Sequence, residues 1–316
     1  MNTDELKLSF VIPCYRSEEI VMNVINEIAG KMKERQEFSY EIIMINDRSP
    51  DNVWQVMKQA AQDNPLIVAI DLAKNVGKHA ALMAGYSMCT GDIIVCVDDD
   101  SQCPLDCLWE LLSPILKEDY DISIAKYSQK KQSGLKNFGS AINDFMLQKL
   151  LSKPKDLQVS NFFAFKKYIC DEMLRYKNPY PYIIGLYLRS TSRIVNVTME
   201  ERERESGESG YTFRKSVALW MDGFTAFSVK PLRFSTFCGF LFAAMGFLYA
   251  LIVVVRKIIY PEIMIGYSSL MAAILFIGGM LMLMLGLIGE YLGRIYISIN
   301  NSPQYVIREI YRKGKE

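Results

Sequence analysis

The sequence IIVCVDDD at residues 93–100 places three carboxylates directly after five consecutive apolar residues. A short run of mostly β-branched residues predicts a strand that is buried on both faces. Asp98, Asp99 and Asp100 cannot remain in that apolar environment, so we expect them at the carboxyl end of the strand. Ligands bind at this edge of an open α/β sheet. Clustered carboxylates suit Mg²⁺ or Mn²⁺ bound to a diphosphate, and a solvated acidic turn is the alternative.

Strands and helices alternate along the chain before this run. The apolar patterns predict strands at 8–13, 41–46, 66–71 and 92–97, with helices at 19–35, 51–62 and 78–89. Alternation at this spacing predicts an α/β domain with a parallel, doubly wound sheet.

Polar residues follow each of the four predicted strands. They occur at 13–18, at Asp47, at 74–78 and at 98–100. Because the carboxyl ends of parallel strands share one edge, these segments should converge on a nucleotide-type site. Neither GxGxxG nor GxxxxGK[ST] occurs, so a metal would have to hold the phosphates in place of a glycine-rich loop.

The composition excludes several classes of protein. A net charge of +1 gives no electrostatic reason to expect nucleic-acid binding. His79 is the single histidine, which excludes zinc sites that need two. The seven cysteines are odd in number and form no CxxC, so we expect small core residues in a reducing compartment.

Two long uncharged runs lie near the C-terminus, at 234–255 and 263–288. Each exceeds the ~20 residues that a helix needs to cross a bilayer. We expect a transmembrane hairpin, with a pair of buried core helices as the alternative. More Lys and Arg follow the second run than separate the two, which predicts both ends of the hairpin in the cytoplasm. The polar N-terminus shows no export signal, and Gly289 and Gly293 permit close packing within the hairpin or in a homo-oligomer.

A charged, glycine-containing segment at 200–210 precedes the first apolar run. It is either a solvated loop or a mobile loop whose Arg202 and Arg204 bind phosphate. Apolar residues then recur from Phe213 to Phe227 at spacings of 4, 3, 4 and 3. This stripe predicts a helix that lies in the membrane interface, and an ordinary core-facing helix is the alternative.

Several motifs in this order resemble glycosyltransferase family 2, in its polyprenyl-phosphate branch. The segments that carry the resemblance are VIPCYRSEE (11–19), INDRSPD (45–51), KNVGKHAALMAGY (74–86), VDDDSQCP (97–104), ERESGESGYTF (203–213), SVKPLR (228–233) and GLIGEYLGRIY (286–296). Each motif alone is weak evidence, but their order and spacing together are specific.

The resemblance implies a domain organisation. A GT-A domain would span 1–211, an interfacial helix 212–230, two transmembrane helices 231–294 and a cytoplasmic tail 295–316. The protein would be a multi-pass protein of the bacterial inner membrane, with its catalytic domain in the cytoplasm.

The resemblance also assigns roles to particular residues. The nucleotide pocket would contain Pro13, Tyr15, Glu18, Asp47, Lys74, Lys78 and Asp98, with Asp47 accepting an N–H of the base. The Mg²⁺ or Mn²⁺ ligands would be Asp98, Asp100 and Gln102. Phosphate and acceptor would bind Lys126, Arg202 and Arg204, and the catalytic residues would be Asp100, Arg204 and Asn161.

Three positions depart from the family pattern. Asn46 replaces an Asp, Gly210 replaces a Lys, and Asn161 falls near an Asp that some relatives are proposed to use as a base. A phosphate monoester has a second pKa of about 6, so it is largely anionic at neutral pH and needs positioning more than a base.

The resemblance therefore implies an inverting transferase that moves a sugar from a nucleotide-sugar donor, such as a UDP-sugar, to a polyprenyl phosphate. Such a reaction would modify cell-envelope glycans. A processive polysaccharide synthase is disfavoured because no QxxRW occurs. The three departures leave open a non-catalytic, membrane-bound scaffold.

Overall fold

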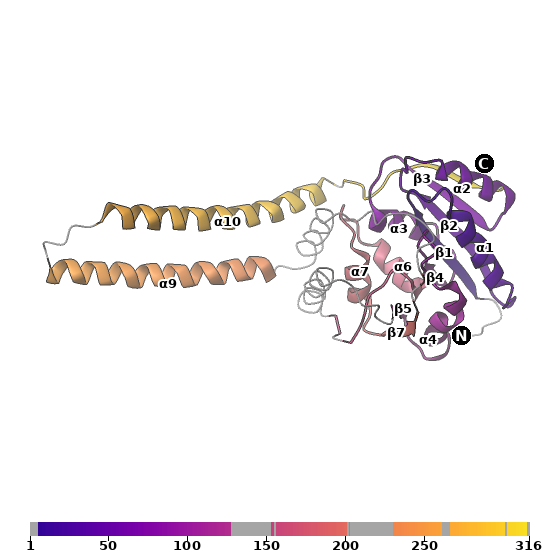
Figure 1. Cartoon of the computed structure of the whole chain (residues 1–316), viewed down its shortest axis with the longest axis horizontal. Helices are drawn as coiled ribbons and strands as arrows, with labels where there is room; N and C mark the ends of the chain where they lie inside the picture. Colours follow the sequence, from indigo (N-terminus) through magenta and orange to yellow (C-terminus); the bar gives the residue numbers. More distant parts are fainter. Residues whose placement is uncertain are drawn as a thin grey trace. The chain divides into compact units, whose positions relative to one another are not determined.

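The computed structural model describes residues 6–127, 153–154, 156–200, 202, 230–260, 266–300 and 302–314 (Figure 1). The chain divides into two units, Met1–Asp222 with Asn301–Glu316, and Gly223–Asn300. The C-terminal segment therefore belongs to the same unit as the N-terminal domain. The predicted interfacial helix at 212–230 lies, except for Lys230, outside the described residues.

An eight-stranded sheet organises the first unit, in the order β7-β5-β6-β4-β1-β2-β3-β8. Its strands are β1 (Lys7–Cys14), β2 (Ser39–Asn46), β3 (Ile67–Leu72), β4 (Ile93–Cys96), β5 (Ile122–Tyr127), β6 (Phe163–Lys166), β7 (Ile194–Met199) and β8 (Ile307–Arg312). The first four are the strands that the sequence predicts, with boundaries that differ by one or two residues.

The prediction of a wholly parallel sheet is wrong, because the sheet is mixed. Strands β1 to β4 are parallel to one another, as expected. However, β6 runs antiparallel to both β4 and β5, and β8 runs antiparallel to β3. A buried strand has the same apolar pattern in either direction, so the pattern alone does not determine how a later segment pairs.

Six α-helices pack against this sheet in the described part of the first unit. They are α1 (Val21–Met32), α2 (Val53–Asp63), α3 (Lys78–Tyr86), α4 (Leu108–Lys117), α6 (Lys167–Leu174) and α7 (Ile183–Ser190). The short 3₁₀ helix η2 (Leu105–Cys107) precedes α4. In α1 the buried residues are Val21, Val24, Ile25, Ile28 and Met32, which is the spacing of one helical face.

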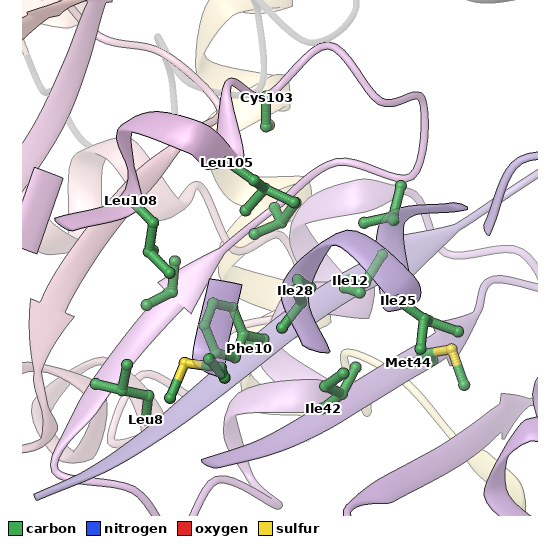
Figure 2. Packing of buried hydrophobic residues seen from close by; sticks show 14 of the residues in the cluster. Leu8, Phe10, Ile12, Ile25, Ile28, Ile42, Met44, Cys103, Leu105 and Leu108 are labelled. Atoms are coloured by element: carbon green, nitrogen blue, oxygen red, sulfur yellow. The ribbon is translucent and has the colours of Figure 1, made fainter. Parts of the chain in front are cut away.

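One face of the sheet forms the main core. Alternate side chains of β1 and β2, among them Phe10, Ile42 and Met44, pack with Ile25 and Ile28 of α1 (Figure 2). Successive side chains of a strand point to opposite faces, so every second residue of these strands enters this core. Figure 2 also shows Leu105 of η2 and Leu108 of α4, which belong to the same core.

Helix α3 lies tightly against the opposite face. A Cβ atom at Gly85 would be 2.6 Å from Cγ1 of Val11 and 2.7 Å from Cδ1 of Ile45. Only a glycine permits this approach, because both neighbours are branched side chains within the sheet. The close contact holds α3 against β1 and β2, and its first residue, Lys78, follows the carboxyl end of β3.

The second unit contains two long helices, α9 (Lys230–Ile259) and α10 (Tyr267–Ile299). They contact each other through Phe242 and Phe276, whose ring centroids are 5.6 Å apart. Among the described residues, one segment, Phe276–Gly293, is long and apolar enough to cross a membrane, and none of it is buried. Helix α9 contains a shorter apolar stretch, Gly239–Tyr249. The described residues thus contain one candidate span, in α10, and the prediction of two spanning helices stays a prediction.

Candidate functional site

The loops that follow the four parallel strands meet at one edge of the sheet. Pro13 of β1 pairs with Ile45 of β2, and Cys14 with Asn46. Strand β4 pairs with β1 up to Cys96 and Val11, and two further residues in the same register place Asp98 across from Pro13. The segments predicted to converge are therefore neighbours.

The same row continues to the other side of β4. Phe163 of β6 pairs with Cys96 of β4 and with Ile124 of β5. Asp98 follows β4 and Asn161 precedes β6, each two residues beyond this Cys96–Phe163 pair, and Lys126 lies two residues beyond Ile124 in β5. These three predicted site residues are far apart in the sequence, and the structure places them in neighbouring strands or in the segments that adjoin those strands.

The carboxylates of the 98–100 segment make different contacts. Asp98 accepts a hydrogen bond from Nζ of Lys78, and its own backbone N–H donates to Sγ of Cys103 at 3.4 Å. Oδ1 of Asp100 accepts from the backbone N–H of Gln102 at 3.2 Å. Lys78 therefore contacts the predicted metal and nucleotide residue Asp98 directly.

Asp99 joins this segment to the loop after β1. Its Oδ2 accepts a hydrogen bond from the backbone N–H of Tyr15 at 2.9 Å. Burial, together with the neighbouring charges of Asp98 and Asp100, raises the pKa of Asp99 to about 6, although the hydrogen bond from the Tyr15 N–H opposes this shift. The sequence placed Asp99 in the acidic cluster but did not predict this link to the loop after β1. Tyr15 itself remains 44% exposed at the edge.

Asp47 holds the loop that leads into α3. Oδ1 accepts from the N–H of Val76 at 2.7 Å, Oδ2 from the N–H of Gly77 at 2.9 Å, and its carbonyl from the Asn75 amide at 2.8 Å. Burial raises the pKa of this carboxyl, and the two N–H donors oppose the rise. A carboxylate oxygen can accept a second hydrogen bond, so the contact with a nucleotide base stays a prediction.

Glu18 ties the loop after β1 to the start of α2. Its Oε2 accepts from the backbone N–H of Asn52 at 3.0 Å, and its own N–H donates to Oδ2 of Asp51 at 3.1 Å. Lys74, by contrast, is exposed at the same edge. The nucleotide-binding roles predicted for both residues stay predictions.

Each of the four loops contains one residue with a left-handed backbone. The φ angles are 60° at Arg16, 49° at Arg48, 83° at Gly77 and 59° at Ser101. Three of these are not glycine, and such conformations are costly for other residues. Strained backbone gathers at functional sites, where the surrounding structure maintains it. The three strained residues, in the loops after β1, β2 and β4, support this edge as the candidate site.

Sequence reasoning missed a buried carboxylate beside the site. Asp71 of β3 accepts a hydrogen bond from Nδ2 of Asn46 at 2.6 Å, and it also contacts Nε of Arg308 in β8. Oδ1 of Asn46 accepts from the N–H of Ser49 at 2.9 Å. The available signal was an acidic residue inside the apolar run LIVAIDL.

Arg202 pairs with two acidic residues in this structure, and its predicted contact with phosphate stays a prediction. Its guanidinium pairs with Glu27 of α1 at 2.7 Å and with Asp106 of η2. In this structure it joins two surface elements rather than presenting charge to a phosphate. Arg204, and the remainder of the predicted phosphate-binding loop beyond Arg202, lie outside the described residues.

The side chains at this edge suit a metal ion that the protein and a substrate bind jointly. Within the described ranges, no group of three His, Cys, Asp or Glu side chains could hold a metal ion. However, Mg²⁺ on a nucleotide typically takes one or two protein carboxylates, and substrate phosphates and water complete the shell. Asp98 and Asp100, both partly exposed at the strand end, fit that requirement.

Comparisons with known proteins agree with this architecture. The model for Glycosyl transferase family 2 matches residues 9–174, and the model for the GtrB C-terminal hairpin matches residues 230–295. The SfII prophage-derived bactoprenol glucosyl transferase of Shigella flexneri is 29% identical, over 97% of this chain and 99% of its own length. The undecaprenyl-phosphate 4-deoxy-4-formamido-L-arabinose transferase of Proteus mirabilis is 30% identical, over 96% and 94%.

A solved structure shows the same fold. Glucosyl-3-phosphoglycerate synthase from Mycobacterium tuberculosis, in complex with Mn²⁺ and UDP-glucose, superposes with a TM-score of 0.51 at 18% identity. The match covers 70% of this chain and 77% of that one. With more than half of its residues matched by the family model and a GtrB-type hairpin behind them, the chain belongs to glycosyl transferase family 2.

Proposed function

We propose that this protein transfers a sugar from a nucleotide-sugar donor, probed first as a UDP-sugar, to a polyprenyl phosphate such as undecaprenyl phosphate. One observation carries the proposal: four loops converge beside Asp98 and Asp100, and the strands next to β4 on the other side, β6 and β5, lead to Asn161 and Lys126. We place the donor diphosphate beside Asp98 and Asp100, and the acceptor phosphate beside Asn161 and Lys126. Relatives named for bactoprenol and undecaprenyl-phosphate reactions align along nearly the whole chain.

The donor side consists of the loops after β1, β2 and β3. Asp47 positions the Asn75–Gly77 backbone, and Tyr15 presents an exposed ring beside it. Asp98 and Asp100 would hold Mg²⁺ or Mn²⁺ on the donor diphosphate. When bound, such a metal neutralises charge that develops on the departing diphosphate. Lys78, in contact with Asp98, adds a positive charge at the same place.

The acceptor side consists of the row through Asn161 and Lys126. The acceptor phosphate is a ready nucleophile, so its oxygen attacks the anomeric carbon while the bond to the nucleoside diphosphate breaks. An in-line displacement of this kind inverts the anomeric configuration. Lys126 would attract the phosphate, and the exposed amide of Asn161 would orient it by a hydrogen bond.

The fold also supports a membrane hairpin with both ends on one side. Helices α9 and α10 contain 30 and 33 residues, and each exceeds the ~20 residues needed for one crossing. Phe240 and Phe247 of α9 and Met282 of α10 are 70% exposed or more, as expected for lipid-facing side chains. Because β8 pairs with β3, the chain returns to its own domain, which requires an even number of crossings. The proposal places the catalytic domain at the cytoplasmic face of the bacterial inner membrane.

A donor and acceptor screen tests the proposal. The full-length protein, in vesicles that contain undecaprenyl phosphate, is given UDP-, GDP- and dTDP-sugars with Mg²⁺, with Mn²⁺ or with EDTA. We expect one donor to yield a lipid-linked sugar and free nucleoside diphosphate, and we expect EDTA to stop both. Asp100→Asn is the matched inactive control. Binding of a nucleotide sugar without turnover under any condition would favour the scaffold instead.

A further inference from the structure

We propose that Arg308, which follows the helical hairpin in the sequence, is a positioning residue for the donor pocket. It acts through Asp71 and Asn46, which connect β8 to the loop that carries Asp47. The inference rests on the proposed donor-binding role of that loop. It assigns to the C-terminal strand a part in the reaction, beyond completing the sheet.

Asp71 is the buried centre of this connection. Asp71 is 0% exposed, and burying a carboxylate without a partner has a large unfavourable free energy. Two groups offset that cost. The amide of Asn46 donates a hydrogen bond to Oδ1 at 2.6 Å, and the guanidinium of Arg308 contacts Oδ2. Arg308 is therefore the cation that neutralises Asp71 in this structure.

A shift in strand register brings Arg308 to this position. Asp71 pairs with Glu309, but the next residue, Leu72, pairs with Ile307, so the pairing passes over Arg308. An extra residue of this kind in an antiparallel pair redirects its side chain. The adjacent Glu309 instead pairs with Lys58 of α2 at 2.6 Å. Neighbouring residues of β8 thus make separate ion pairs, one buried at Asp71 and one at the surface.

Asn46 transmits the position of Asp71 to the pocket loops. While its Nδ2 donates to Asp71, its Oδ1 accepts from the N–H of Ser49. Oγ of Ser49 in turn accepts from the N–H of Arg16 at 2.8 Å, in the loop after β1. Asp47 lies in the chain between Asn46 and Ser49, which these hydrogen bonds hold in place. Its orientation therefore depends on the amide of Asn46.

This arrangement also explains why residue 46 is Asn in this chain. An ionised Asp there would place a second carboxylate at 2.6 Å from Oδ1 of Asp71. Like charges at that distance could not both remain ionised. Asn supplies an N–H₂ donor for Asp71 and a carbonyl acceptor for Ser49 in one side chain.

The test uses the full-length protein and four variants. Arg308→Met removes the charge but keeps a long side chain, and Arg308→Lys keeps the charge. The double variant Arg308→Met with Asp71→Asn also removes the buried carboxylate that Arg308 neutralises. Glu309→Gln is the matched control, since it disrupts only the surface pair on the same strand. The two readouts are amide hydrogen exchange of peptides covering 46–52 and affinity for UDP, GDP and dTDP with Mn²⁺.

We expect Arg308→Met to speed exchange in 46–52 and to weaken the best-bound nucleotide by about three- to tenfold. Arg308→Lys should restore part of both properties, and the double variant should restore most of them. Glu309→Gln should behave as the parent protein. Restoration by the double variant separates a positioning role from a general loss of β8.

Unchanged exchange in Arg308→Met, with normal nucleotide binding by the parent, would overturn the positioning role alone. A double variant as impaired as Arg308→Met would also overturn it. Failure of the parent protein to bind any of the three nucleotides would instead overturn the donor-pocket assignment, and the positioning role with it.

Discussion

Oδ2 of Asp47 accepts a hydrogen bond from the backbone N–H of Gly77 at 2.9 Å, which joins the end of β2 to the start of α3. Gly77 has a φ of 83°, a conformation that glycine adopts without strain. The next residue, Lys78, contacts Asp98. The position of α3 relative to the acidic segment therefore depends on Asp47.

Asp47→Asn should weaken donor binding and lower stability. An Asn side chain has one acceptor oxygen, so the N–H of Val76 or of Gly77 loses its partner. Leaving a fully buried donor unsatisfied costs about 1–3 kcal/mol, and because these two N–H groups are only partly buried the loss should lie toward the lower end of that range. Thermal unfolding and nucleotide titration measure the two effects. Asp63→Asn, at an exposed carboxylate of α2, is the control and should change neither.

Asp100→Ala should abolish transfer while the protein still folds, because this carboxylate is partly exposed at a strand end. Loss of a ligand to the diphosphate-bound metal removes several kcal/mol of transition-state stabilisation. Steady-state turnover with Mg²⁺ or Mn²⁺, alongside circular dichroism of the variant, measures this. Near-normal turnover by the purified variant would contradict the metal assignment.

The pH dependence of the transfer rate should follow the ionisation of the acceptor phosphate and should not depend on the side chain at residue 161. Activity should rise with an apparent pKa of about 6, that of a phosphate monoester, and then level off. Asn161→Asp should shift this profile little, and Asn161→Ala should cost about 1 kcal/mol, roughly one hydrogen bond. Rates between pH 5 and 9 check this. A large gain from Asn161→Asp would show that the reaction waits for a base.

His79 should make the protein less stable in mild acid. Burial and the charge of Lys78 lower the pKa of its imidazole from 6.5 to about 4, and its ring packs edge-on against Tyr182 with centroids 5.3 Å apart. Below pH 6.5 the unfolded chain therefore binds a proton that the folded protein does not. The contribution of neutral His79 to the free energy of unfolding is fully present above pH 6.5. This contribution is lost as the pH drops toward 4, by up to about 3 kcal/mol.

The variant His79→Phe keeps an aromatic ring against Tyr182 and cannot titrate. Its unfolding free energy should lack this component of the decline between pH 6.5 and 4, as measured by thermal or denaturant unfolding in detergent. Because His79 is the single histidine, no other imidazole contributes. Identical pH profiles for the parent and the variant would mean that His79 titrates normally in the folded state.

The termini should lie on the same side of the membrane. Strand β8 pairs with β3, so residue 316 and the N-terminal domain are both expected in the cytoplasm. Reporter fusions at residue 316 and at the N-terminus measure this directly. A reporter that is active only outside the cytoplasm at residue 316 would exclude the hairpin.

Much of the donor side could be predicted because its signals are local. The apolar run at 93–97 ends in three Asp residues, and the strands before it end in polar loops. The apolar pattern places the strand boundaries to within a few residues. The parallel pairing of β1 to β4 follows from the helices between them, because parallel strands need a crossover connection. Asp98 and Asp100 could thus be placed at the sheet edge without coordinates.

The sequence by itself determined the α/β alternation, the edge that carries the acidic segment and the two apolar runs near the C-terminus. Only the tertiary structure decided that β6 and β8 run antiparallel, that Arg202 pairs with Glu27, and that Arg308 reaches Asp71. Strands, helices and apolar runs depend on residues that are close together in the chain, so the pattern of apolar residues in the sequence predicts them directly. Contacts between distant segments depend on which sheet edge is open when the chain returns, and a strand of alternating residues such as 307–312 pairs equally well at several edges.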